Sequence, residues 1–237
     1  MSRVTIHPLR LRYSNAYLLL GDRPILVDTG SRGDAPRIEA ALAAVGVALR
    51  DISLILHTHV HSDHFGNTAE FAAKAGCPVS YHPADQPLAA QGHNGSLQGI
   101  GLRGRVLARL CENLPFKSVD AGIPAEEGMR LDHFGLPASI IQTPGHTAGS
   151  ITVLLDSGEA IAGDTIMGGW AGGVIRRGKP NFHYFADDLP MAMASLDRIL
   201  AASAGHLYVG HGGPLRRDDV ARWRASHRRG ESGGGLP

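Results

Sequence analysis

A short, wholly apolar run, ISLIL at residues 52–56, leads directly into the polar stretch HTHVHSDHFGN at 57–67. A continuous apolar run of this length is typical of a strand buried on both faces of a sheet. Apolar residues at helical spacing over 34–46 precede the run, and a second helix is predicted over 67–76. This alternation of buried strands with helices restricts the chain to a layered α/β fold.

The same alternation continues along the chain. Further strands are predicted at 17–20, 25–30, 78–82, 139–143, 151–156, 159–164 and 206–210, and further helices at 105–114, 189–201 and 218–229. Glycines interrupt residues 83–118, which we interpret as a helical insertion lying over one end of the sheet. We therefore predict a single domain, residues 1–230, followed by a flexible tail at 231–237.

The composition is that of an ordinary globular protein, with 43% hydrophobic and 19% charged residues. A formal net charge of +1 gives no reason to expect nucleic acid or a membrane as the partner. Two cysteines form neither a disulfide framework nor a zinc ribbon. The N-terminal residues have no apolar core of a signal peptide, so we expect a cytoplasmic protein with a small-molecule substrate. The oligomeric state stays open, and a homodimer is one option.

Imidazoles and carboxylates follow the predicted strands, each at the carboxyl end of a strand. They are Asp28, His59, His61, Asp63, His64, His146, Asp164 and His211. Ligands bind at this edge of open α/β sheets. His59, His61 and Asp63 are spaced two apart, so they face the same side of an extended chain. A turn near Gly66 would bring in His64 as well. Such side chains suit zinc and, less selectively, iron, manganese or nickel.

The segment HVHSDH at 59–64 matches the H-x-H-x-D-H signature of the metallo-β-lactamase-fold superfamily, and the chain resembles that superfamily. VDTG, TPGHTAGS, GDT and GHG match its other motifs in the same order, over roughly residues 15–215. The resemblance implies a four-layer αβ/βα sandwich, in which two mixed β-sheets face each other and helices lie outside.

The resemblance also implies a dinuclear site with two Zn2+ ions per chain, with iron or manganese as other options. It assigns His59, His61 and His146 to the first metal. It assigns Asp63, His64 and His211 to the second metal, and Asp164 to both as a bridge. Asp63 is in addition a candidate acceptor of the proton from the attacking water. We expect Asp28 to orient a ligand imidazole or its loop, and His57 to be a packed bystander.

The implied activity is that of a zinc-dependent hydrolase. A metal-bridged hydroxide would cleave an ester, thioester, lactone or related acyl bond of a small molecule. The motif set is that of the glyoxalase II-like branch. Asp164 counts against a β-lactamase, and the lack of a tyrosine soon after it weakens a lactonase. β-Lactamase or phosphodiesterase action on the same site stays an alternative. A second alternative is a mononuclear-iron persulfide dioxygenase using His59, His146 and Asp164.

The glycine-rich stretch GGWAGGVIRRG at 168–178 follows the bridging aspartate. We interpret it as a loop, in the place where this superfamily usually builds its substrate pocket. Trp170, His183 and Tyr184 are the candidates for lining the pocket. The alternative is that these side chains pack on the surface of the fold.

Overall fold

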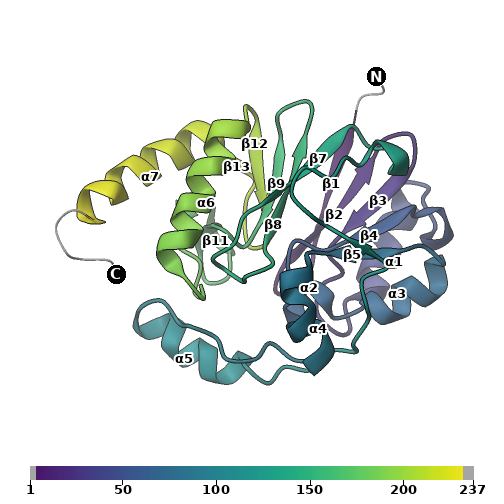
Figure 1. Cartoon of the computed structure of the whole chain (residues 1–237), viewed down its shortest axis with the longest axis horizontal. Helices are drawn as coiled ribbons and strands as arrows, with labels where there is room; N and C mark the ends of the chain where they lie inside the picture. Colours follow the sequence, from purple (N-terminus) through teal and green to yellow (C-terminus); the bar gives the residue numbers. More distant parts are fainter. Residues whose placement is uncertain (1–3, 232–237) are drawn as a thin grey trace.

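The computed structural model describes residues 4–231 (Figure 1). One mixed sheet has six strands, in the spatial order of their numbers. They are β1 (Thr5–Arg10), β2 (Asn15–Leu20), β3 (Pro24–Val27), β4 (Leu54–Leu56), β5 (Val79–Tyr81) and β6 (Ile123–Pro124). β1, β2 and β3 pair antiparallel, whereas β3 to β6 pair parallel. Parallel pairing requires crossovers, and the first helices of the chain supply them.

The second mixed sheet has five strands in the order β13-β12-β9-β8-β7. They are β7 (Ala138–Gln142), β8 (Ile151–Leu155), β9 (Ala160–Gly163), β12 (His206–Val209) and β13 (Leu215–Arg216). β9 and β12 are parallel neighbours, so the residues that follow them emerge at the same edge. A separate hairpin is formed by β10 (Met167–Trp170) and β11 (Ile175–Asn181).

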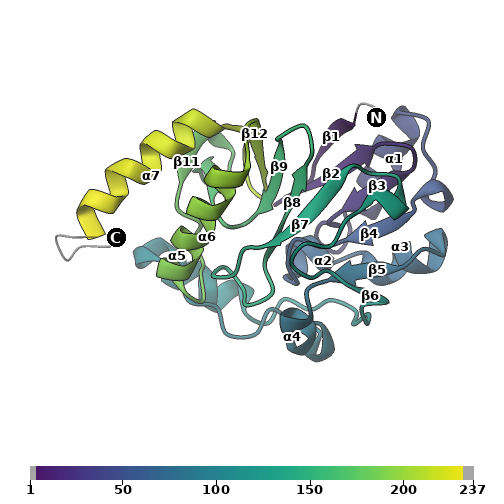
Figure 2. The ribbon, with the colours of Figure 1, turned by 45° about the horizontal axis from the view of Figure 1, so that its top comes forward.

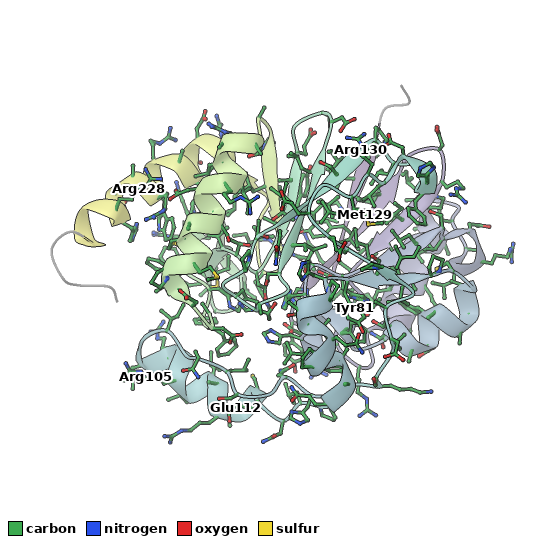
Figure 3. All side chains as sticks on the ribbon, viewed as in Figure 1. Tyr81, Arg105, Glu112, Met129, Arg130 and Arg228 are labelled. Carbon is green, nitrogen blue, oxygen red and sulfur yellow. The ribbon has the colours of Figure 1, made fainter. Side chains whose placement is uncertain are left out.

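Helices cover the outer face of each sheet. They are α1 (Ala35–Ala44), α2 (Ser62–Phe65), α3 (Thr68–Ala75), α4 (Gln86–Gln91), α5 (Gly101–Cys111), α6 (Leu189–Ala202) and α7 (Arg217–Glu231). Figure 2 shows α1 and α3 beside the first sheet and α6 and α7 beside the second. α4 and α5 lie at the lower end of the molecule in Figure 1, and Arg105 and Glu112 mark α5 in Figure 3.

Three buried clusters of side chains fill the spaces between the four layers. Two of them can lie on opposite faces of one sheet because side chains alternate along each strand. Leu18 and Ile55 pack toward α1 and α3, in a cluster that includes Phe71. Tyr17 and Leu54, which are neighbours of those residues in the chain, point to the other face and fill the space between the sheets. A third cluster joins the second sheet to α6 and α7. Each fully buried leucine or isoleucine contributes roughly 1.5–3 kcal/mol. The predicted four-layer αβ/βα sandwich is confirmed.

The structure corrects several local expectations. Residues 168–178 form most of a β-hairpin rather than a loop, because glycines at positive φ, such as Gly169 and Gly172, permit the bulge and the turn. β1 was not predicted. α5 begins four residues before the expected 105 and ends before Pro115, which cannot continue a helix.

Residues 83–118 contain α4 and α5, as expected of a helical insertion. We call residues 92–116 of this insertion the cover. Helix α7 runs to Glu231, so the predicted tail at 231–237 falls, apart from its first residue, outside the described residues. Within residues 4–231, no helix is both long and apolar enough to cross a membrane.

Candidate metal centre

The residues predicted from the strand ends come together at one edge shared by the two sheets. Asp28 follows β3, His59 follows β4, His146 follows β7, Asp164 follows β9 and His211 follows β12. Helix α2 begins at Ser62, immediately after His61. This turn brings Asp63 and His64 back toward His59 and His61, as the sequence required. His57 is fully buried, with its ring packed against Phe65, and its Nε2 lies 3.0 Å from Thr68 Oγ1.

His59, His61 and His146 form a first potential metal-binding group. One ring nitrogen from each lies within 4.8 Å of the others, and all three side chains are buried. His61 Nδ1 lies 3.1 Å from His146 Nε2. Two neutral imidazole nitrogens this close, in a buried place, form a donor set that a single cation could share.

Asp63, His64 and His211 form a second group. Asp63 Oδ2 lies 3.3 Å from His211 Nε2 and 3.7 Å from His64 Nε2. Asp63 is more open than its neighbours, with 26% of its side chain exposed. Asp63 therefore contacts the two histidines of its group and is also accessible to solvent.

Asp164 lies between the two groups. Its Oδ2 is 3.7 Å from His59 Nε2 and 3.6 Å from His146 Nε2, on the first side. On the second side it is 3.3 Å from His64 Nε2 and 3.2 Å from His211 Nε2. Space beside this carboxylate depends on Gly210, because a Cβ there would lie 1.9 Å from Asp164 Oδ1. The position of one carboxylate oxygen between two nitrogen-rich groups is what a bridging ligand requires.

Hydrogen bonds orient four of the imidazoles so that Nε2 faces the centre. His59 Nδ1 contacts Thr58 Oγ1 at 3.1 Å, and His64 Nδ1 donates to Asp28 Oδ2 at 2.8 Å. The Phe185 carbonyl accepts the Nδ1–H of His146 at 2.9 Å, and the Tyr13 carbonyl accepts the Nδ1–H of His211 at 2.8 Å. Such partners set the tautomer that leaves Nε2 with a free lone pair.

Asp28 has the orienting position that we expected. Besides His64, its carboxylate accepts the Thr58 N–H at 2.9 Å and the Thr58 hydroxyl at 2.8 Å. It is fully buried and has φ 61°, a conformation that Asp and Asn adopt more readily than other side chains. Burial opposes its charged form, but His64 and His57 lower the pKa of Asp28.

Asp85 is a supporting residue that sequence reasoning missed. Its buried carboxylate accepts Val60 N–H at 3.0 Å, the Thr147 hydroxyl at 2.9 Å and Gly149 N–H at 2.8 Å. It thereby ties the loop of His59 and His61 to the loop of His146. The letters HPAD carry no motif, and an aspartate before a helix resembles an ordinary cap, so no local signal identified it.

The charge distribution fits a cation. Burial opposes protonation of His64, but Asp164, Asp63 and Asp28 raise its pKa, and carboxylates likewise raise the pKa of His211 to about 10. Burial and neighbouring imidazoles instead lower the pKa of His59 and His61. The carboxylates of the second group therefore favour positive charge at this place, which a bound cation would supply.

Unpartnered buried atoms point the same way. Within the described chain, His59 Nε2, His64 Nε2 and Asp164 Oδ1 are buried without a hydrogen-bond partner. Buried polar atoms without partners are costly, and a bound ion would satisfy them. The residues therefore fit a divalent metal pair.

A cavity of about 650 Å³ opens onto the centre. Asp63, Asp164 and His211 form its floor, and the cover contributes apolar side chains that include Leu97, Leu107 and Leu114. Of the three candidates for lining the pocket, His183 and Tyr184 do line it.

The prediction for Trp170 is wrong, because its side chain lies outside the cavity. Its ring faces the Arg176 guanidinium on the β10–β11 hairpin at 5.8 Å. Trp170 ends β10 just after a bulge in the hairpin, where it pairs with Ile175, and 39% of the residue is exposed. Ala171 and Gly172 of the turn reach the cavity in its place.

His183 enters the centre more deeply than a pocket-lining residue. Its Nε2 lies 3.2 Å from Asp164 Oδ2, and only 7% of the residue is exposed. Burial lowers the pKa of His183 to about 3, despite the nearby Asp164. No motif marked this position, because the histidine follows an irregular segment after β11.

Known proteins share this fold and sequence pattern. A probable metallo-hydrolase of Methanocaldococcus jannaschii is 32% identical over 200 residues, which cover 84% of this chain and 87% of its own. A hydroxyacylglutathione hydrolase of Alkalilimnicola ehrlichii is 33% identical over 180 residues, covering 76% of this chain and 54% of that protein. The match with the second relative therefore leaves nearly half of it without a counterpart.

Solved structures agree. A metallo-β-lactamase family protein from Thermus thermophilus gives a TM-score of 0.69 at 25% identity, covering 95% of this chain and 79% of that one. A protein solved in a di-iron-bound form gives a TM-score of 0.63 at 26% identity, and the match covers 94% of this chain and 97% of that one. A family model described as the metallo-β-lactamase superfamily matches residues 9–211. The chain belongs to the metallo-β-lactamase superfamily.

Proposed function

We propose that the protein is a dinuclear metal-dependent hydrolase, with zinc as the metal. The observation that carries the proposal is the position of Asp164 Oδ2 between two complete donor groups. We assign His59, His61 and His146 to one ion and Asp63, His64 and His211 to the other. Asp164 would contact both.

When bound, a pair of divalent cations supplies Lewis acidity, which lowers the pKa of water and polarises a carbonyl group. The chain does the rest. Thr58, Asp28 and the carbonyls of Phe185 and Tyr13 hold the imidazoles in the ligating tautomer. In this scheme the Asp63 carboxylate, the most open of the site carboxylates, accepts the proton of the attacking water.

The substrate we propose is a small ester, thioester or lactone. The apolar side of the cavity favours an apolar body, while the polar floor would face the bond to be cleaved. The hydroxyacylglutathione hydrolase among the relatives is consistent with a thioester. We still predict a cytoplasmic location. We also still predict a small-molecule substrate, with neither nucleic acid nor a membrane as a partner.

A mononuclear-iron dioxygenase is the second candidate. His59 Nε2 and His146 Nε2 both lie within 3.7 Å of Asp164 Oδ2, so two imidazoles and one carboxylate could hold a single iron. One similar structure holds two iron ions, so iron suits this family of sites.

Metal analysis and a substrate screen test the proposal together. Protein purified without added metal should contain about two zinc ions per chain and should hydrolyse at least one of a panel of thioesters, lactones and aryl esters. About one iron per chain, together with oxygen uptake on glutathione persulfide, would replace the hydrolase with the dioxygenase. A panel that also contains β-lactams and phosphodiesters separates the remaining alternatives.

A further inference from the structure

His183 contacts the centre but belongs to neither of the two donor groups that share Asp164. Its ring centroid lies 4.5 Å from that of His146 and 5.1 Å from that of His211, and its Nε2 faces Asp164 Oδ2. It is close enough to His146 and Asp164 for the three to share an ion. A buried imidazole in this position is therefore either a further metal ligand or a hydrogen-bond donor. Which of the two it is depends on the nitrogen that carries the proton, because a protonated nitrogen cannot bind a metal.

The backbone of Phe185 determines that choice. Its carbonyl lies 2.9 Å from His146 Nδ1, so it accepts the N–H that a ligating His146 must carry on that nitrogen. Its amide N–H lies 3.1 Å from His183 Nδ1 and has no other acceptor within the described chain. An amide nitrogen can only donate, so this hydrogen bond forms when His183 Nδ1 offers a lone pair.

The alternative arrangement is less favourable. His183 Nδ1 also lies 3.1 Å from Phe185 O, so an Nδ1–H could donate there. That tautomer would direct the Nδ1–H toward an oxygen that already accepts from His146, and would leave the Phe185 N–H without an acceptor. An unpaired N–H of this kind costs about 1–3 kcal/mol, which favours the tautomer with the proton on Nε2.

We propose that His183 is a hydrogen-bond donor that does not ligate metal, and that its Nε2–H binds the carbonyl oxygen of the substrate. This rests on the proposed hydrolase function. In the absence of substrate, the Nε2–H faces Asp164 Oδ2 at 3.2 Å. His183 lines the cavity together with Leu97 and Leu107, so a substrate with an apolar body could present its oxygen to this oriented donor.

Phe185 thus gives two neighbouring imidazoles opposite tautomers. Its carbonyl leaves His146 with a lone pair toward the centre, and its N–H leaves His183 with a proton toward the centre. A donor placed where negative charge develops during acyl transfer typically accounts for about 10²–10³ in kcat.

The first experiment is long-range 1H–15N NMR on the zinc-loaded protein. The His183 signals are assigned by their absence from the spectrum of His183→Phe. We expect an unprotonated Nδ1, and an Nε2 that carries a proton and is not bound to metal. A metal-bound or unprotonated Nε2 would overturn the proposal. So would a His183→Phe protein that loses one of about two zinc ions per chain.

The second experiment measures hydrolysis of an acyl ester that the screen finds active. His183→Phe should lower kcat about 100-fold with little change in KM. His183→Gln should recover part of the rate, because its amide can donate. His133→Gln, an exposed histidine on a distant turn, is the matched control and should keep the full rate. An unchanged kcat in His183→Phe with full zinc content would overturn the substrate role.

The two proposals fail in distinguishable ways. If the wild-type protein hydrolyses none of the acyl compounds, the hydrolase and the substrate role of His183 fall together. The NMR and zinc measurements need no substrate, so they still decide whether His183 is a donor or a ligand. They also need only the wild-type protein and one folded variant, His183→Phe or His183→Gln.

Discussion

Two regions line the cavity and are built differently: the edge of the two sheets that carries the histidines and aspartates, called the edge below, and the cover. At the edge, His59, His64 and His146 are almost fully buried, and a hydrogen bond orients each of them. In the cover, Leu102 and Leu110 of α5 are 79% and 69% exposed. The edge is a network of polar contacts that orients the imidazoles, whereas the cover packs on one side only.

The cover is nevertheless attached to the metal-binding loop. Asn94 accepts the Ser62 N–H at 2.6 Å and donates to the carbonyl of Cys111 at 2.8 Å. Ile100 N–H donates to Tyr184 O at 2.8 Å. These contacts hold α5 over the cavity, but its side chains can change without disturbing the polar network. We infer that the edge determines the chemistry and the cover tunes the substrate, and four substitutions test this difference.

The largest effect is expected at the edge. His61→Ala removes a nitrogen that lies 3.1 Å from His146 Nε2, so it should abolish most metal binding and lower the hydrolysis rate at least about 100-fold. Zinc content and kcat/KM are the measurements. Full activity with full zinc content would show that the assignment of the first group is wrong.

Asp28→Asn should affect the second group most directly, through His64. Asn also tolerates the positive φ of residue 28, but its NH2 group cannot accept the N–H of His64. His64 would then keep its proton on Nε2 and could not ligate, so zinc content should fall from about two to about one, with a rate loss of about 10–100-fold. Asp132→Asn, at an exposed aspartate paired with Arg130, is the control. Unchanged zinc content would contradict the orienting role of Asp28.

Asp85→Ala should mainly lower the free energy of unfolding, because Asp85 joins two loops and does not itself belong to either donor group. It leaves the N–H groups of Val60 and Gly149 without an acceptor and removes one partner of the Thr147 hydroxyl, which predicts a loss of roughly 3 kcal/mol. The free energy of unfolding in urea measures this loss. Lys74→Ala removes exposed ion pairs with Glu39 and Glu70, which solvent screens, so it should lower the free energy of unfolding far less. Equal losses in the two variants would mean that Asp85 does not link the loops.

The smallest change is expected in the cover. Leu107→Ala enlarges the apolar side of the cavity and should raise KM about 5-fold, with zinc content unchanged and stability lowered by about 1 kcal/mol. Leu110→Ala, on the outer face of the same helix, should leave KM unchanged. A loss of zinc in Leu107→Ala would remove the distinction between edge and cover.

Much of the fold and the centre could be predicted from the sequence. The run ISLIL and its counterparts indicated buried strands, and ordered motifs after them placed His59, His61, Asp63 and the distant His146 at one edge. These predictions succeed because burial on a strand and the position at its carboxyl end are both written in local periodicity. A turn near Gly66 was also anticipated, whereas short α2, which turns Asp63 and His64 toward the others, already begins at Ser62.

Only the tertiary structure revealed Asp85, the direction of Trp170 and the depth of His183. Asp85 and His183 depend on contacts between separate segments, because Asp85 meets Gly149 and His183 meets Asp164, whereas the direction of Trp170 depends on pairing within the β10–β11 hairpin. Phe185 orients two imidazoles through its backbone, which every residue type except proline shares, so its side chain gives no signal. The sequence by itself determined the proposed ligand set, because metal binding requires particular side chains. The tautomers and the shape of the cavity were decided by tertiary packing, because they depend on which backbone groups come within hydrogen-bonding distance.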